Sequence, residues 1–214
     1  MKILITGFDP FDKEKINPAY EAVKLLPDNI SGAEIIKLEI PTVFCRGAFK
    51  MEKAIEEHNP DCVICVGQAG GRSCISVEKV AINYIDARIP DNDGNQPVNT
   101  SIVADGDTAY FSTLPVRAMV ENIREKGIPA NLSFTAGTFV CNEVMYRLLH
   151  LIHIKYHHIR GGFIHVPYTA AQAVGKPDGT ASMDEKTIAK GLEYAIEAIV
   201  QDKEHGSGNL GTTH

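Results

Sequence analysis

The amino-acid sequence predicts an α/β protein, a three-layer α/β/α sandwich with a mostly parallel, twisted sheet. Short apolar runs typical of strands alternate along the chain with segments of helical periodicity. Glycine, proline and asparagine gather between these segments, where turns are needed. No repeat, low-complexity tract or linker divides the chain. We therefore expect a single domain over residues 1–200 and a polar, flexible tail over residues 201–214.

Apolar and β-branched runs bounded by turn residues predict the strands. The run that begins at Ser73 reads either as one long strand or as one arm of a hairpin. The predicted strands are residues 2–6, 34–40, 62–66, 73–84, 132–135 and 162–166.

Helical spacing and end signals predict the helices. Asn17 followed by Pro18 is an N-cap with proline at the first helical position. Gly127 stands just beyond the end of another helical pattern. The predicted helices are residues 19–26, 43–58, 115–126, 139–156 and 183–200, and the polar segment 86–100 is predicted as a loop.

The composition excludes several classes of protein. The 214 residues carry a formal net charge of −6, which is unlike the basic surface of a nucleic-acid-binding domain. No apolar run has the length of a membrane span, and no leader peptide is recognisable at the start. The five cysteines are irregularly spaced. Because this pattern does not resemble a disulfide framework, we expect a cytoplasmic protein.

Cys141 and His165 are candidates for a nucleophile and its base. Cys141 follows a strand-like run and a glycine, and it falls in the first turn of a predicted helix. Unpaired amides and the helix dipole at such a position favour a thiolate. His165 ends an apolar strand, and imidazole titrates near neutral pH. A cysteine at a helix start and a histidine at a strand end are typical of a cysteine hydrolase.

Each candidate also has a structural interpretation. Cys141 shares the apolar face of Val144 and Met145, as a core cysteine would. His165 could be satisfied by a backbone carbonyl. Glu78 lies on a predicted strand face with Val80 and Ile82, where a carboxylate needs a partner. A histidine would supply one and would be oriented by it, although a salt bridge on an edge strand is the alternative.

Other chemistries lack their sequence signatures. The glycine-rich residues 67–72 follow a strand, but they match neither the dinucleotide-binding pattern nor a P-loop. A G-x-S-x-G serine elbow is absent. Cys62 and Cys65 lie on one predicted strand and would point to opposite faces. Histidines 150, 153 and 157 share a helix face without further ligands at suitable spacing, so we expect no metal site there.

Three sequence blocks together resemble the pyroglutamyl peptidase type I family, also called pyrrolidone-carboxylate peptidases. The match spans essentially residues 1–200. The blocks are Gly67–Arg72 running through Glu78 to Asn83, Thr135–Asn142 with Tyr146, and His165–Tyr168, with Gly7–Phe11 and Ala87–Asn92 as further family-like stretches.

This resemblance implies a catalytic triad of Cys141, His165 and Glu78. It also implies a cytoplasmic, homotetrameric enzyme without metal or cofactor that removes N-terminal pyroglutamate from peptides. The implied fold is the sandwich seen in nucleoside phosphorylases. A phosphorylase-like enzyme and a non-catalytic ligand-binding relative on the same fold are the alternatives.

The resemblance further implies a mostly apolar pocket for the uncharged lactam ring. One departure from the family lies beside it, because residues 12–15 read Asp-Lys-Glu-Lys where the family usually carries glycines. This loop could change the preferred residue after pyroglutamate. The predicted substrate-binding residues are Phe8, Phe11, Thr42, Gln68, Arg88, Ile89, Phe139 and Val140.

Overall fold

The computed structural model describes residues 1–201, 210 and 211. The predicted tail, residues 201–214, therefore lies almost entirely outside the described residues. The strands are β1 (Lys2–Phe8), β2 (Asn29–Ile30), β3 (Ala33–Ile40), β4 (Cys62–Gln68), β5 (Ile75–Glu78), β6 (Val80–Ile82), β7 (Ala109–Phe111), β8 (Ala130–Ser133) and β9 (Arg160–Val166). The helices are α1 (Pro18–Lys24), α2 (Arg46–His58), α3 (Val116–Glu125), α4 (Val140–Ile154), α5 (Ala170–Ala173) and α6 (Glu185–Val200).

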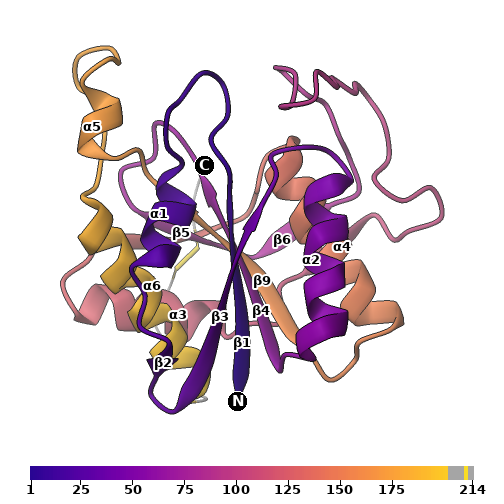
Figure 1. Ribbon diagram of the computed structural model, residues 1–214, viewed down its shortest axis with the longest axis horizontal. Helices are drawn as coiled ribbons and strands as arrows, with labels where there is room; N and C mark the ends of the chain where they lie inside the picture. The colour runs from indigo at the N-terminus through magenta and orange to yellow at the C-terminus, as the bar shows by residue number, and fades with distance from the viewer. Residues whose placement is uncertain (202–209, 212–214) are drawn as a thin grey trace.

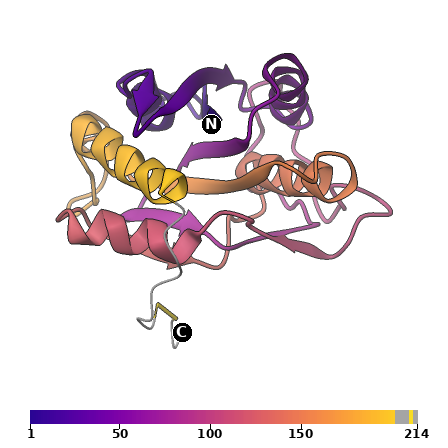
Figure 2. The same cartoon turned by 90° about the horizontal axis from the view of Figure 1, so that it is seen from below.

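The main sheet has seven strands in the order β2-β3-β1-β4-β9-β5-β8. The neighbours β3, β1, β4 and β9 run parallel, whereas β2 is antiparallel to β3 and β5 is antiparallel to β9. Helices α1, α3 and α6 lie on one side of the sheet and α2 and α4 on the other (Figure 1). The view from below shows the same two layers, with α6 in yellow and α4 in orange (Figure 2). This arrangement confirms the predicted α/β class.

Alternating side chains of the central strands fill two apolar cores. Ile3 and Ile5 of β1 belong to the core beneath α1 and α6, and Leu4 belongs to the core beneath α2 and α4. Cys62 and Cys65 of β4 likewise fall in different cores, which confirms that they point to opposite faces. Every residue of β4 is buried, as expected of a central strand covered on both sides.

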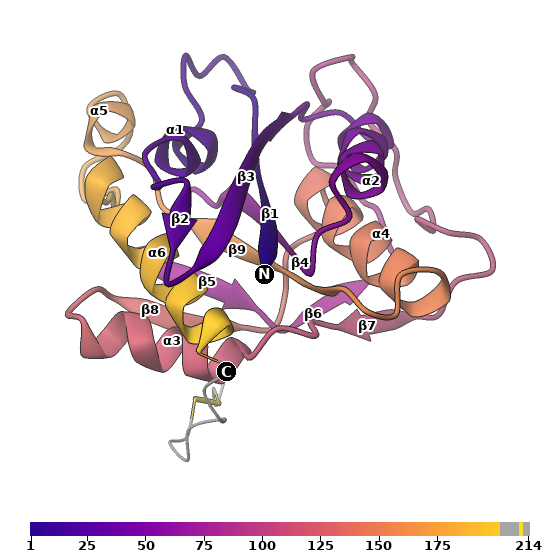
Figure 3. The same cartoon turned by 60° about the horizontal axis from the view of Figure 1, so that its bottom comes forward.

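The segment from Ser73 to Tyr84 is not one strand. Strand β5 ends at Glu78 in the main sheet, and β6 begins at Val80 and pairs with β7 in a separate two-stranded sheet. Figure 3 shows β6 and β7 beside α4, beyond the end of β5. The expectation that Glu78 shares a strand face with Val80 and Ile82 is therefore wrong, because the chain changes sheets at Lys79.

Other differences have local causes. Helix α2 begins at Arg46 because Cys45 has a φ of 62°, which a right-handed helix does not allow. The short elements β2, β7 and α5 were not predicted, since two to four residues carry no readable periodicity. No helix within the described part of the chain is long and apolar enough to cross a bilayer.

Asn142, one residue after Cys141, fastens α4 to β6. Its side-chain oxygen accepts a hydrogen bond from the Ile82 amide at 3.0 Å. Its amide group donates to the carbonyls of Ile82 and Tyr84 at 2.9 and 3.0 Å. The side chain is 1 % exposed, so losing it would leave buried backbone groups without partners.

We expect Asn142→Ala to lower the free energy of unfolding by about 2–4 kcal/mol, because several buried polar groups lose their partners together. Urea unfolding followed by circular dichroism would measure the change. The control is Asn29→Ala, which removes one exposed hydrogen bond to the Gly32 amide and should cost less than about 1 kcal/mol. Equal losses for the two variants would contradict this account of Asn142.

Candidate active site

A cavity of about 320 Å³ opens at the carboxyl ends of β1, β4 and β9. Ligands bind at this edge in open α/β sheets. The cavity joins segments that are far apart in the sequence. Seven predicted site residues line it, namely Phe8, Phe11, Thr42, Gln68, Phe139, Cys141 and His165, together with Asn17, Ala69, Gly70, Arg72, Ala136 and Gly137.

Glu78 lies behind His165 and holds its ring. The Nδ1 atom of His165 lies 2.7 Å from the Oε1 atom of Glu78. This contact follows from the antiparallel pairing of β5 with β9, which sets Ser76 opposite His165 and Glu78 opposite Phe163. The Glu78 side chain is fully buried. The ring of His165 also packs on Phe163, with ring centroids 4.8 Å apart.

The protonation states of this pair follow from their surroundings. Burial alone would raise the pKa of Glu78, but its contacts with His165, Ser133 and Arg72 outweigh burial and hold the pKa below its usual value. Burial lowers the pKa of His165 below 6.5, although Glu78 opposes this effect. Near neutral pH the carboxylate is therefore charged and the ring neutral. An ionised carboxylate only accepts, so Nδ1 must carry the proton and Nε2 is left unprotonated.

Arg72 is a site residue that the sequence reasoning missed. Its guanidinium donates to Glu78 Oε1 at 2.7 Å and to the Thr135 carbonyl at 3.1 Å. It thereby balances the buried carboxylate and ties the loop after β4 to the segment that leads into α4. The signal was present in the sequence, because Arg72 is the one cation in a glycine-rich loop that follows a buried strand.

Cys141 lies in the first turn of α4 and reaches over strand β4. A Cβ atom added to Gly67 would lie 2.9 Å from the Cys141 sulfur and 2.8 Å from the Phe163 ring. Gly67 is paired in register with His165 on the neighbouring strand. Because residue 67 has no side chain, the sulfur of Cys141 has space beside β9, the strand that carries His165.

The position at a helix start does not make this thiol acidic. Burial raises the pKa of Cys141 to about 12, the negative charge of Glu78 adds to the effect, and Arg72 opposes it. The expected thiolate is therefore not the resting form. The start of α4 can still bind an oxygen atom, because its N-cap residue Phe139 makes no side-chain hydrogen bond to the first backbone amides of the helix. Those N–H groups remain available to an oxygen atom of a ligand.

Aromatic rings form the apolar wall of the cavity. Phe139 contacts Phe11 with centroids 6.4 Å apart, and it meets the edge of Phe44 at 5.3 Å. Phe8 packs against Phe163 at 6.3 Å, which connects the wall to the ring beneath His165. The polar side chains of the wall are largely engaged with protein. The Thr42 hydroxyl donates to the Asp9 carbonyl, and the Gln68 oxygen accepts from Gln172.

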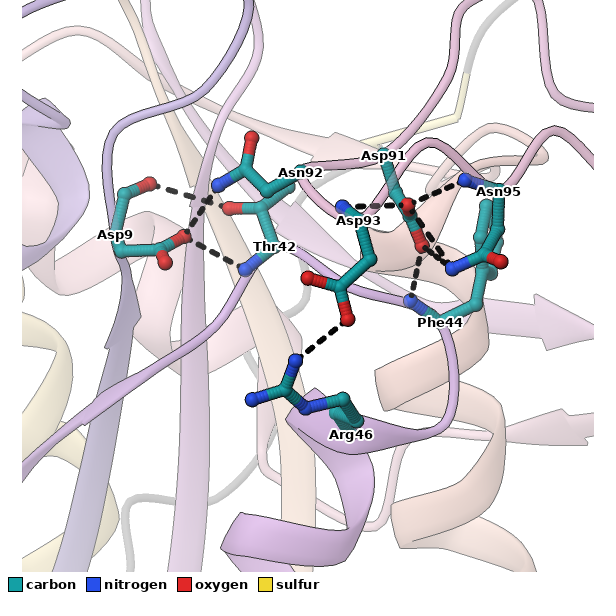
Figure 4. Close-up of polar contacts among 8 residues, drawn as sticks. All are labelled: Asp9, Thr42, Phe44, Arg46, Asp91, Asn92, Asp93 and Asn95. Atoms are coloured by element: carbon teal, nitrogen blue, oxygen red, sulfur yellow. Dashed lines mark hydrogen bonds and ion pairs between the residues drawn. The ribbon is translucent and has the colours of Figure 1, made fainter.

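The loop of residues 86–100 is fastened to this wall (Figure 4). The carboxylate of Asp91 accepts hydrogen bonds from the amides of Phe44, Asp93 and Asn95 at 2.8–3.0 Å. The side-chain amide of Asn92 donates to Asp9, whose carboxylate also accepts from the Thr42 amide. The loop therefore fixes the backbone from which Thr42 and Phe44 project.

Three predicted substrate-binding residues do not line the cavity. Val140 is fully buried in the core beneath α4, Arg88 is exposed, and Ile89 is partly exposed beyond the wall. Their roles stay predictions. Among the described residues, no cluster of three or more His, Cys, Asp or Glu side chains could hold a metal ion.

A family model described as pyroglutamyl peptidase matches residues 1–202 of the chain. A pyrrolidone-carboxylate peptidase of Clostridium perfringens is 62% identical over 200 residues, covering 94% of this chain and 93% of that protein. One of Enterococcus faecalis is 58% identical over 214 residues, with all of both chains covered.

Solved structures agree with these similarities. The crystal structure of pyroglutamyl peptidase I from Bacillus amyloliquefaciens superposes with a TM-score of 0.92 at 47% identity, covering 97% of this chain and 99% of the other. The pyrrolidone carboxyl peptidase of Thermococcus litoralis gives a TM-score of 0.93 at 39% identity, covering 98% and 99%. The chain, matched along nearly its whole length in sequence and in fold, belongs to the pyroglutamyl peptidase family.

Proposed function

We propose that this protein is a cysteine peptidase that hydrolyses the amide bond after an N-terminal pyroglutamyl residue, with Cys141 as nucleophile, His165 as base and Glu78 as the residue that positions the base. The observation that carries the proposal is that one cavity is lined by a thiol and by an imidazole whose ring is held by a buried carboxylate. Relatives that this chain matches over at least 93% of their own length are named as pyrrolidone-carboxylate peptidases.

Because thiol and imidazole are both neutral at rest, general-base attack is the proposed first step. The Cys141 sulfur bonds to the scissile carbonyl carbon as its proton passes to Nε2 of His165. The charged imidazolium that forms is stabilised by Glu78. The amides at the start of α4, that of Cys141 first, would donate to the oxyanion.

The remaining steps return the enzyme to its starting state. The imidazolium donates its proton to the nitrogen of the leaving peptide as the C–N bond breaks, which leaves a thioester on Cys141. His165 then takes a proton from water, whose oxygen attacks the thioester carbonyl. The C–S bond breaks, the sulfur regains a proton from His165, and free pyroglutamate leaves.

The cavity also explains selection of the lactam. Its aromatic wall suits an uncharged ring, and its one permanent charge, Arg72, is positive and already paired with Glu78. An ordinary N-terminus would bring an ammonium group into this space without a free carboxylate to receive it. Its desolvation would be costly. The phosphorylase-like and non-catalytic alternatives are not favoured, because the matched relatives are named as peptidases.

We also propose that the enzyme acts as a homo-oligomer, a tetramer as the family resemblance implies, in the cytoplasm. All five cysteines are free, and one of them, Cys45, is exposed. Such thiols fit a reducing compartment.

Wild-type protein should release the fluorophore of a pyroglutamyl arylamide and leave the glutamyl arylamide intact, because only the lactam lacks an ammonium group. Cys141→Ala should fold and be inactive, since it lacks the sulfur. Fluorescence assays measure both, and circular dichroism verifies folding. Normal turnover by folded Cys141→Ala would rule out the proposed nucleophile.

In the pH profile of kcat/KM, the midpoint of the acid limb should lie below pH 6.5. The reason is that the rate requires neutral His165 and burial lowers the pKa of this ring. Glu78→Gln should reduce kcat by about 10²–10⁴-fold, because the ring loses its charged partner. The acid limb should also move to lower pH, since Glu78 raises the pKa of His165. A pH series with the pyroglutamyl arylamide measures both effects.

Glu143→Gln is the matched control for Glu78→Gln. Glu143 is another fully buried carboxylate, and it pairs with Arg147 on α4 rather than with His165. Its substitution should leave the acid limb in place. An unchanged pH profile in Glu78→Gln would reduce Glu78 to a structural carboxylate.

Gly67→Ala should lower kcat at least tenfold, because its methyl group would occupy the space of the Cys141 sulfur, and small displacements of reacting atoms are costly. Steady-state kinetics on folded protein measures the loss. The control is Gly161→Ala, whose methyl group would press on Ile152 and Leu148 instead. It should lose stability yet retain turnover. Wild-type kcat in Gly67→Ala would refute the steric role assigned to Gly67.

A further inference from the structure

A charged groove adjoins the catalytic cavity. Its volume is about 580 Å³, and it lies between residues 12–16 of the loop after β1 and residues 171–176 in and after α5. The same loop serves both spaces, because Phe11 and Asn17 line the cavity while the residues between them line the groove. In Figure 1 this loop rises between α5 and the 86–100 loop.

The groove and the cavity share a wall. The side-chain nitrogen of Gln172, which lines the groove, donates to the side-chain oxygen of Gln68, which lines the cavity, at 2.9 Å. Gln172 is 8 % exposed and is held by a capping box with Thr169. The junction is therefore a fixed, buried contact between the walls of the two spaces.

An ion pair spans the groove. The ammonium group of Lys176 contacts the carboxylate of Glu14, and the side chains are 29% and 18% exposed. Lys176 also lies over the ring of Tyr168, 4.8 Å from its centroid. Tyr168 in turn fills the space beside Gly70, where an added Cβ atom would lie 2.1 Å from the tyrosine hydroxyl. Since Gly70 lines the cavity, the ion pair is connected to the catalytic site through packed atoms.

We propose that this groove binds the residues that follow pyroglutamate in the substrate, and that the Glu14–Lys176 pair determines which charge is preferred there. The inference rests on the proposed function, which places the pyroglutamyl ring in the cavity and the scissile bond at Cys141. The remainder of the peptide must leave the cavity at its mouth. The groove is the adjoining space, and an extended chain advances about 3.3–3.6 Å per residue along it.

In the wild-type protein the pair weakens the charge preference that Glu14 or Lys176 alone would create. Each charge neutralises the other, so a charged residue of the substrate gains little from either. Removing one partner leaves the other free. Glu14→Gln frees the cation of Lys176 and should favour an acidic residue after pyroglutamate. Lys176→Gln frees the carboxylate of Glu14 and should favour a basic one.

The experiment compares two pyroglutamyl dipeptide amides that differ only in a second residue of Glu or Lys. The readout is the ratio of kcat/KM for the Glu substrate to that for the Lys substrate. Relative to wild type, the ratio should rise about fivefold in Glu14→Gln and fall about fivefold in Lys176→Gln, the size expected of one partly screened charge pair. The double variant with Glu14→Lys and Lys176→Glu should return toward the wild-type ratio, because it restores a pair.

Lys53→Gln is the matched control. It makes the same chemical change in an exposed ion pair with Glu56 on α2, far from the groove in the fold, and should leave the ratio unchanged. Ratios that stay at the wild-type value in both groove variants would overturn the proposal. Hydrolysis of the pyroglutamyl arylamide separates the two hypotheses: if the arylamide is cleaved and the ratios do not move, the groove assignment alone is wrong. If no pyroglutamyl substrate is cleaved, the proposed function fails first.

Discussion

The hydrogen bond between Glu78 and His165 is the contact on which the rest of the site depends. A fully buried carboxylate is costly unless it is paired, and here the imidazole and Arg72 both contact the same oxygen. Strand β5 runs antiparallel to β9 and parallel to β8, so the sheet reverses direction between β9 and β5, and this reversal delivers Glu78 to the side of β9 that bears His165. The direction of one strand therefore sets the chemistry available at the edge of the sheet.

Two opposing effects act on Cys141, and their sizes decide its resting state. A charge at a helix start gains about 0.3–1 kcal/mol, which is less than the 1.36 kcal/mol that corresponds to one pKa unit. Burial, the largest cause, acts in the opposite direction, and the pKa of the thiol rises from 9.0 to about 12. The effect of burial on the pKa of the thiol is larger than the effect of the helix start, so the thiol stays protonated until a base accepts its proton. The same burial keeps His165 neutral and able to act as that base.

Much of this architecture follows from sequence patterns, because long buried strands and amphipathic helices carry clear periodicity. The segments after β1, β4 and β9 meet at one edge, as the parallel order predicts. The break at Lys79 was not predictable, since the apolar pattern continues from β5 into β6 across two different sheets. Arg72 was also missed, because its role depends on a long-range contact with Glu78 and Thr135 that no local spacing reveals.

One loop, the loop after β1, fixes the walls of the cavity from both sides. On one side Asp9 accepts hydrogen bonds from Thr42 and Asn92, and on the other Glu14 pairs with Lys176. Between these anchors Asp12 and Lys13 adopt φ values of 50° and 66°, a left-handed conformation that glycine adopts at no steric cost. Side chains here cost about 1–2 kcal/mol each in conformational strain, and they also reduce the freedom of the unfolded loop. The charged sequence at residues 12–15 therefore gives up the conformational freedom of glycine, and the ion pair of Glu14 with Lys176 holds the loop. A loop held in this way keeps Phe11 in position in the wall of the cavity before a ligand binds.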